Sequence, residues 1–289
     1  MEQIDQKNLG EIFTAIMQNN LPSDLLAWIN EKAVRIREEN NAAELYLTFA
    51  SLPRKTGRHP IQVESELQQK LAEIYQQYSI SDWTIDRLCR VWVLLQTDKT
   101  DKVFYLSKLQ NLFKAAEMNE LVALYYALPS FYFAEEWKKQ CAEGIRSNIG
   151  IVLEAIMYNN PYPYIYLDQN AWNQLVLKAF FTEKDVNRII GIDDRANADL
   201  ASILIDYASE RWAAHRMVHP QLWRLVAPFI TEKNFDSIRR AFNSNKPVEK
   251  KAAALACFNS NFEPAKLLLE NDLELKNAIQ TKNLTWHLL

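Results

Sequence analysis

Glycine scarcity restricts the fold of this chain more strongly than any other property of its sequence. Five glycines occur among 289 residues, whereas an average protein contains roughly 7% glycine. The tight turns of β-hairpins need residues with positive φ, and glycine adopts such angles most readily. The sequence therefore predicts an all-helical fold.

Apolar residues recur at helical spacing along most of the chain. Between residues 63 and 78, for example, successive apolar residues are separated by three or four positions, which is the stripe of an amphipathic helix. Similar stripes indicate roughly fourteen to sixteen short helices. We expect them to stack as antiparallel pairs in an irregular α-α superhelix of the HEAT type, with a compact helical bundle as the alternative.

No linker divides the sequence, so we expect a single all-helical domain over residues 1–289. Its C-terminal part, 247–289, begins with PVEKKAAALACFNSNFEPAKLLLE, which resembles one helix pair of a HEAT repeat. Loops are expected at 53–60 and at 159–166, because the prolines in both segments disfavour helix.

Charge and cysteine content argue against several classes of protein. A net charge of −3 provides no basic field for nucleic acid. Three widely spaced cysteines in apolar contexts indicate buried free thiols rather than disulfides or a zinc site. No apolar run approaches the roughly 18 residues of a membrane span, and no signal-peptide pattern is present. We expect a cytoplasmic protein that does not itself cross a membrane.

Charged and amide residues interrupt apolar helical stretches between residues 143 and 228, where we expect the functional site. Burying a charge is costly unless it is paired or bound to a ligand, so this region holds an internal polar network or a binding site. The candidates share a charged or amide side chain, and they are Arg146, Asn148, Glu154, Asn159, Asn160, Asn173, Lys178, Arg188, Asp193, Arg195, Glu210, Arg211 and Arg224.

A long helix is expected to run from Asn197 to about Val218. Its apolar stripe continues through Arg211 and His215. An arginine keeps its charge, so a buried Arg211 needs an acceptor, and Glu154 within the apolar run IVLEAIM is an attractive partner. A structural ion pair and a pair that faces a ligand would both produce this pattern.

No established catalytic or cofactor motif occurs, since GxGxxG, GxxxxGK[ST], HExxH and GxSxG are all missing. His215 and His219 have the spacing of two metal ligands on a helix, but no third ligand is obvious. The run from Asp193 to Asn197 is similar to an aspartate-rich magnesium motif, although a helix cap explains it better. We expect no metal and no cofactor. Whether the chain is an enzyme stays open, with a non-catalytic role preferred.

Six segments resemble the EboA family. They are EGIRSN at 143–148, EAIMYNNPYP at 154–163, AWNQLVLKAFF at 171–181, RIIGIDDRAN at 188–197, YASERWAAHR at 207–216 and PQLWRLVAPF at 220–229. The resemblance covers about residues 120–260. EboA proteins are encoded with a membrane prenyltransferase of the UbiA type and other enzymes, in gene clusters linked to making or exporting a small secondary metabolite.

The resemblance implies an accessory role in such a pathway and supplies no catalytic residues. The first hypothesis is a non-catalytic helical adaptor that binds a partner enzyme, for example the prenyltransferase, and lies peripheral to the inner membrane through that partner. The second is a binder or enzyme acting on an anionic small molecule, prenylated or not, in a groove of the 143–228 helices. A satisfied polar network would favour the adaptor, whereas an enclosed aromatic cavity with unpaired cationic side chains would favour the binder.

Overall fold

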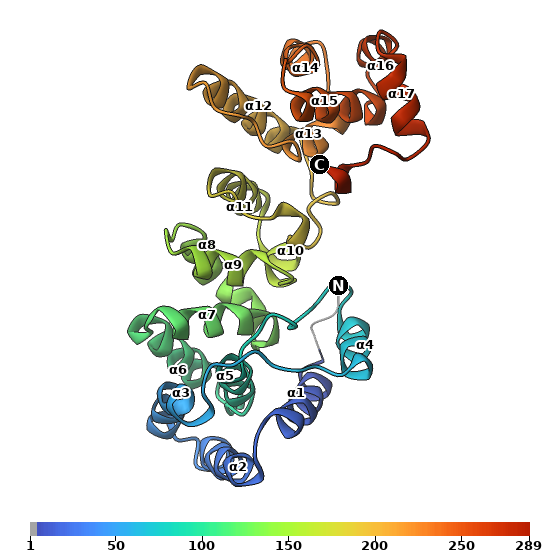
Figure 1. Ribbon diagram of the computed structural model, residues 1–289. Coiled ribbons are helices and arrows are strands. Elements are labelled where there is room, and N and C mark those ends of the chain that lie inside the picture. Colours follow the sequence, from blue (N-terminus) through green and yellow to red (C-terminus); the bar gives the residue numbers. More distant parts are fainter. Residues whose placement is uncertain (1–4) are drawn as a thin grey trace. The chain divides into compact units, whose positions relative to one another are not determined.

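The chain is all-α in the computed structural model, which describes residues 5–289 (Figure 1). Within this range there are seventeen α-helices and five short 3₁₀ helices, and no strand. Two isolated β-bridges join Pro60 to Thr84 and Tyr158 to Ile189. The fold class predicted from glycine scarcity is therefore confirmed, whereas the superhelical arrangement stays a prediction.

Contacts between residues divide the chain into two compact units. The N-terminal unit comprises the described residues up to Trp172 together with 188–190, and the C-terminal unit comprises 173–187 and 191–289. The single domain expected from the sequence stays a prediction.

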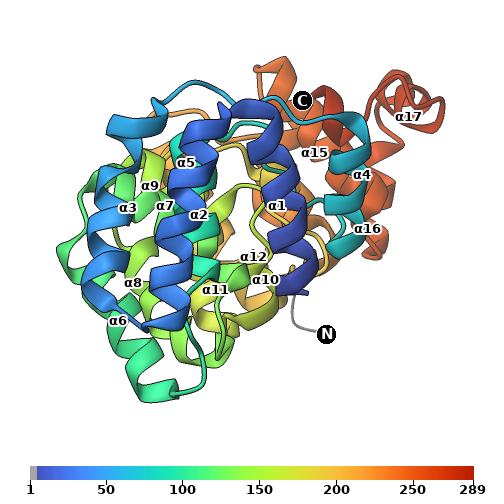
Figure 2. The same ribbon diagram turned by 90° about the horizontal axis from the view of Figure 1, so that it is seen from below.

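Helix α5 (Ile85–Leu95) lies at the centre of the N-terminal unit, where it packs against α1, α3 and α7 (Figure 1). A helix covered on several sides must be apolar almost all round, and IDRLCRVWVLL meets this requirement except at its charged residues. Figure 2 shows α1, α2 and α3 side by side. The other helices of this unit are α1 (Gln6–Asn20), α2 (Ser23–Glu38), α3 (Ala42–Thr56), α4 (Ser65–Ile74), α6 (Lys102–Ala115), α7 (Met118–Ala127), α8 (Lys138–Ile145), α9 (Gly150–Met157) and α10 (Tyr162–Tyr166).

Helix α15 (Pro247–Asn259) is the central helix of the C-terminal unit and packs against α13, α14, α16 and α17 (Figure 1). Its buried stretch 252–257 consists of alanine and cysteine apart from Leu255, and these small side chains let the neighbouring helices approach closely. The helix pair expected over 247–270 is present as α15 and α16, while its likeness to a HEAT repeat stays a prediction. The remaining helices are α11 (Gln169–Phe181), which begins in the N-terminal unit, α12 (Ala198–Ala213), α13 (Leu222–Val226), α14 (Phe235–Phe242), α16 (Glu263–Leu269) and α17 (Leu273–Gln280).

Proline does not exclude helix from the two segments where a loop was expected, so both expectations are partly wrong. Helix α3 continues through Pro53 to Thr56, and α10 occupies Tyr162–Tyr166. Pro163 lies in the first turn of α10, where the backbone N–H that proline lacks has no helical acceptor in any case. Pro53 lies near the end of α3, so it removes the donor of one helical hydrogen bond.

The helix expected to reach Val218 ends earlier, at Ala213. The Asn197 side chain caps its start, as predicted, by accepting a hydrogen bond from the Leu200 N–H at 2.9 Å. His215 has a φ of 56°, which lies outside the right-handed helical region, and its side chain is exposed. The expectation that His215 continues a buried stripe is therefore wrong.

All three cysteines are buried and free, as predicted. Burial raises the pKa of the Cys257 thiol to about 12, which keeps it protonated at neutral pH. No helix within residues 5–289 is both long and apolar enough to cross a lipid bilayer.

Two glycines provide a matched test of the packing. An added Cβ at Gly144 in α8 would lie 2.5 Å from side-chain atoms of Ile156 and Tyr125, whereas an added Cβ at Gly10 in α1 would meet nothing within 4 Å. We expect Gly144→Ala to lower the free energy of unfolding by about 1–3 kcal/mol, and Gly10→Ala to raise it by about 0.5–1 kcal/mol. Unfolding by denaturant measures both changes in the free energy of unfolding, and changes of the same sign in the two variants would contradict this packing.

Candidate functional site

The candidate side chains between residues 143 and 228 differ widely in exposure. Asn160 and Asn173 are buried, and seven are half-buried: Glu154, Asn159, Lys178, Arg188, Arg195, Arg211 and Arg224. The expectation of burial is wrong for the four that are exposed, Arg146, Asn148, Asp193 and Glu210. Arg146, Asn148 and Asp193 lie in connections between helices, and Glu210 lies on a solvent-facing part of α12.

Asn160 connects three segments of the N-terminal unit. Its Nδ2 donates to the carbonyl oxygens of Tyr125 at 3.0 Å and Ala155 at 2.9 Å, and its Oδ1 accepts from the Tyr162 N–H at 3.0 Å. These bonds use both donors of the amide and one lone pair of its oxygen, so Asn160 is a structural residue. The preceding Asn159 has a φ of 50°, which asparagine tolerates better than most residues.

Asn173 has an equivalent role in the C-terminal unit. Its side chain and that of Asn197 exchange two hydrogen bonds, of 3.3 and 2.9 Å. Asn197 at the same time caps α12. The amide pair therefore fixes the start of α12 against α11.

Two candidate arginines are paired with carboxylates of their own units. Arg188 forms an ion pair with Asp82, and its guanidinium lies 4.2 Å from the centre of the Tyr158 ring. Arg224 makes a two-pronged contact with Asp193, in which Nε lies 2.6 Å from Oδ1 and Nη2 contacts Oδ2. Each pair is partly exposed, so its expected contribution to stability is modest.

Arg211 lies beside an open hollow of about 260 Å³ in the C-terminal unit. Its Nε donates to the Met217 carbonyl oxygen at 3.0 Å, and its Nη2 lies 4.0 Å from Oε1 of the exposed Glu183. Glu154 belongs to the N-terminal unit. The expected Glu154–Arg211 pair stays a prediction, and the acceptors found for Arg211 lie in its own unit.

His219 lines the same hollow as Arg211. Its Nδ1 accepts a hydrogen bond from the Gln221 N–H at 3.2 Å, and its ring packs edge-on against Phe180. Burial lowers the pKa of His219, and this effect is opposed by Asp185 and Glu183. The imidazole is therefore held neutral. The described residues contain no cluster of three side chains of the His, Cys, Asp or Glu type suited to a metal ion.

A lowered pKa in the folded state gives a definite pH dependence of stability. As the pH falls through about 6.5, His219 takes up its proton in the unfolded chain before it does so in the folded chain. The free energy of unfolding should therefore decrease between pH 7.5 and pH 5.5, and His219→Gln should reduce that decrease. Urea unfolding at both pH values measures this, and an unchanged slope in the variant would show that His219 is not the group responsible.

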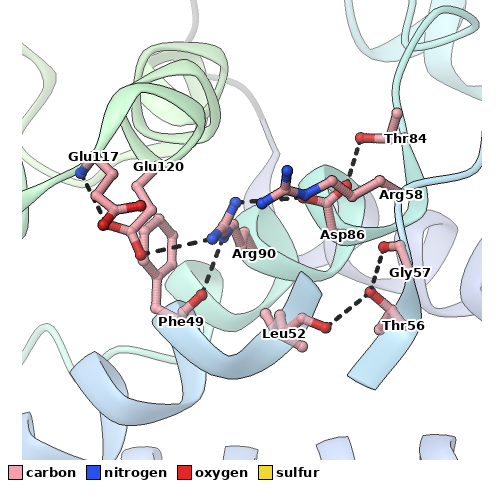
Figure 3. Close-up of polar contacts among 10 residues, drawn as sticks. All are labelled: Phe49, Leu52, Thr56, Gly57, Arg58, Thr84, Asp86, Arg90, Glu117 and Glu120. Carbon is pink, nitrogen blue, oxygen red and sulfur yellow. Dashed lines mark hydrogen bonds and ion pairs between the residues drawn. The ribbon is translucent and has the colours of Figure 1, made fainter. Parts of the chain in front are cut away.

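The most deeply buried ion pair of the described chain lies outside the 143–228 region. Figure 3 shows Arg90, on α5, surrounded by acceptors from three helices. Its Nη1 lies 3.3 Å from Asp86 Oδ2, and its Nη2 lies 3.6 Å from Glu120 Oε1. The side chains of Arg90 and Asp86 are only 3% and 5% exposed. This network was not predicted, although Asp86 and Arg90 are a charged pair at positions i and i+4 of an otherwise apolar helix.

The third acceptor of Arg90 is explained by Pro53. Arg90 Nε donates to the Phe49 carbonyl oxygen at 3.0 Å (Figure 3). In a regular helix that oxygen would accept from the N–H of the residue four positions later, which is Pro53 and has no N–H. The guanidinium therefore replaces a helical hydrogen bond inside the core, where an unsatisfied carbonyl would be costly.

Both carboxylates around Arg90 have further hydrogen bonds. Glu120 Oε2 accepts from the Glu117 N–H at 3.0 Å and so caps α7. Asp86 Oδ1 accepts from the Thr84 hydroxyl at 2.6 Å, and Arg58 Nε lies 4.0 Å from Asp86 Oδ2 (Figure 3). The network therefore joins α3, α5 and α7 around the Arg90 guanidinium, each nitrogen of which has an acceptor.

Removing the central charge should be strongly destabilising. Arg90→Met leaves buried Asp86 without its arginine, and we expect a loss of about 3–5 kcal/mol in the free energy of unfolding. Arg35→Met is the control, since Arg35 pairs with Glu31 on the surface of α2, and its expected cost is about 0–1 kcal/mol. In a Pro53→Ala background a backbone N–H is restored, so Arg90→Met should cost about 1 kcal/mol less. If Arg90→Met costs the same free energy of unfolding in both backgrounds, Arg90 does not replace the helical hydrogen bond that Pro53 removes.

The family model described as metabolite traffic protein EboA matches residues 9–227, which is more than half of the chain. The matched region contains all thirteen candidate residues and the network around Arg90. No curated protein and no solved structure gives a significant match.

Proposed function

Because the chain belongs to the EboA family of metabolite traffic proteins, we propose that it is a non-catalytic accessory protein that binds another protein of the same pathway. Family membership is consistent with an accessory role in a metabolite pathway. That the chain binds a partner protein, and through which surface it does so, are the parts of the proposal that go beyond family membership. The membrane prenyltransferase implied by the family resemblance is the first partner to test.

The proposal rests on one observation: several of the candidate polar side chains already have ion-pair or hydrogen-bond partners within the protein. Arg224 is held by Asp193 and Arg188 by Asp82, while Asn160 binds backbone groups. Catalytic groups usually combine a perturbed pKa with free bonding capacity toward a substrate. Side chains that hold helices to one another instead support a role as a scaffold.

A small exposed surface between α8 and α9 is suited to contact with a protein. Ile149 and Ile151 are each 37% exposed, and Arg146 and Asn148 beside them in the sequence are also exposed. Apolar side chains next to an arginine are typical of protein interfaces. We propose that this surface, 146–151, contributes to partner binding.

Binding to pathway proteins tests the proposal directly. The tagged full-length chain would be co-expressed with each protein encoded in the same gene cluster, and complexes would be isolated and sized by gel filtration. We expect a defined complex with one partner, lost in a variant carrying Ile149→Ser and Ile151→Ser. Leu47→Ser, at a 69% exposed site on α3, is the matched control and should retain the complex.

Two outcomes would contradict the proposal: turnover of the pathway metabolite by the purified chain alone, or no complex with any pathway protein. The alternative is an anionic small molecule bound in a groove of the 143–228 helices. It has less support, because Arg188 and Arg224 already contact carboxylates of their own units.

A further inference from the structure

A second open hollow, of about 420 Å³, lies within the C-terminal unit at the end of α12, the end of α14 and the start of α15. This volume is in the range of small-molecule sites. The lining of this hollow is mainly polar and includes Trp212, Arg216, Arg240, Lys246 and Glu249. Most of them lie beyond residue 228, outside the region in which a site was expected.

Positive charge is in excess at this hollow. Arg216, Arg240 and Lys246 are exposed, and no acidic side chain of residues 5–289 forms an ion pair with any of them within 4.0 Å. Arginine forks match the oxygen atoms of phosphate, and a lysine ammonium adds a compact charge. Three cationic residues that line one hollow and have no ion-pair partner in the described part of the chain favour an anionic ligand.

The one carboxylate of the hollow, Glu249, is already committed to the protein. It is 4% exposed, its Oε1 accepts from the Trp212 Nε1–H at 2.6 Å, and its Oε2 accepts from the Ser244 hydroxyl at 2.5 Å. Both oxygens are therefore used in holding the wall of the hollow. Glu249 fixes the position of Trp212 and does not pair with the cationic groups.

Trp212 in turn positions one of the arginines. The Arg240 guanidinium lies 4.3 Å from the centre of the Trp212 ring, and that ring stacks on Trp223 at 5.7 Å. A cation held over an aromatic face loses less freedom when it binds a ligand. The start of α15, which has no side-chain cap, adds the positive partial charge of a helix N-terminus beside Lys246.

We propose that this hollow binds the phosphate group of a small phosphate ester. Two guanidinium groups and one ammonium suit a dianion better than a single carboxylate, and the hollow has room for the carbon part of an ester. The amides of Asn243 and Asn245 line the same hollow and offer neutral donors to it. The phosphate site lies in the C-terminal unit and residues 146–151 lie in the N-terminal unit, so the two proposals rest on different observations.

Isothermal titration of the full chain at low ionic strength provides the test, with glycerol 3-phosphate, inorganic phosphate and glycerol as probes. We expect both phosphates to bind and glycerol not to bind. Arg216→Ala and Arg240→Ala should each weaken phosphate binding about tenfold or more. A thermal melt of each variant identifies any loss of folding. Arg240→Lys keeps the charge but loses the forked guanidinium, so its phosphate affinity should lie between those of the wild type and Arg240→Ala.

Arg239 supplies a matched control on the same helix. It is adjacent to Arg240 in the sequence, but its Nη1 pairs with Asp236 at 2.9 Å and its guanidinium lies over Phe235. Arg239→Ala removes the same charge outside the hollow and should change affinity by no more than about twofold. Glu249→Gln removes the negative charge from the wall and should tighten phosphate binding several-fold.

Equal losses of phosphate affinity in Arg239→Ala and Arg240→Ala would overturn the proposal, because they would show that phosphate is attracted by the net charge of the protein and not by the hollow. The absence of phosphate binding to the wild-type chain would also overturn it. An ester that binds more tightly than inorganic phosphate would support the proposal and show that the carbon part contacts the hollow.

Discussion

A permanently charged group with almost no access to water lies at the centre of the N-terminal unit, and the surrounding helices are arranged to neutralise it. Arg90 contacts the carboxylates of Asp86 and Glu120 and the carbonyl oxygen of Phe49. A buried cation in a medium of low dielectric constant tolerates few alternative arrangements of its acceptors. The positions of α3 and α7 against α5 are therefore specified by polar contacts in addition to apolar packing.

Polar groups have a different role between residues 143 and 228. Arg188 and Arg224 there are partly exposed and each is paired with one carboxylate, whereas the buried polar residues Asn160 and Asn173 are neutral amides. An amide can satisfy several backbone groups without the desolvation cost of an ion. This explains how a region rich in polar residues still forms well-packed helices.

The sequence predicted the fold class because glycine content and helical spacing are local properties, and it located the α15–α16 pair for the same reason. It also identified Asn197 as a helix cap. Burial of individual charges was less predictable, because it depends on which helices later cover a residue. Arg90 lies in an otherwise apolar helix with Asp86 four residues before it, so a buried ion pair there could be predicted from the sequence, whereas the covering of this pair by α3 and α7 could not. His215 was misplaced because the end of α12 depends on a single left-handed residue.

The hollow beside α15 spans the boundary of the family match, since Trp212 and Arg216 precede residue 227 whereas Arg240, Lys246 and Glu249 follow it. Part of the lining of the hollow thus lies within the family match, and the rest comes from α14, α15 and the segment between them, which follow it. A change in α14 or α15 would therefore alter the lining of this hollow without changing any residue that the family model matches.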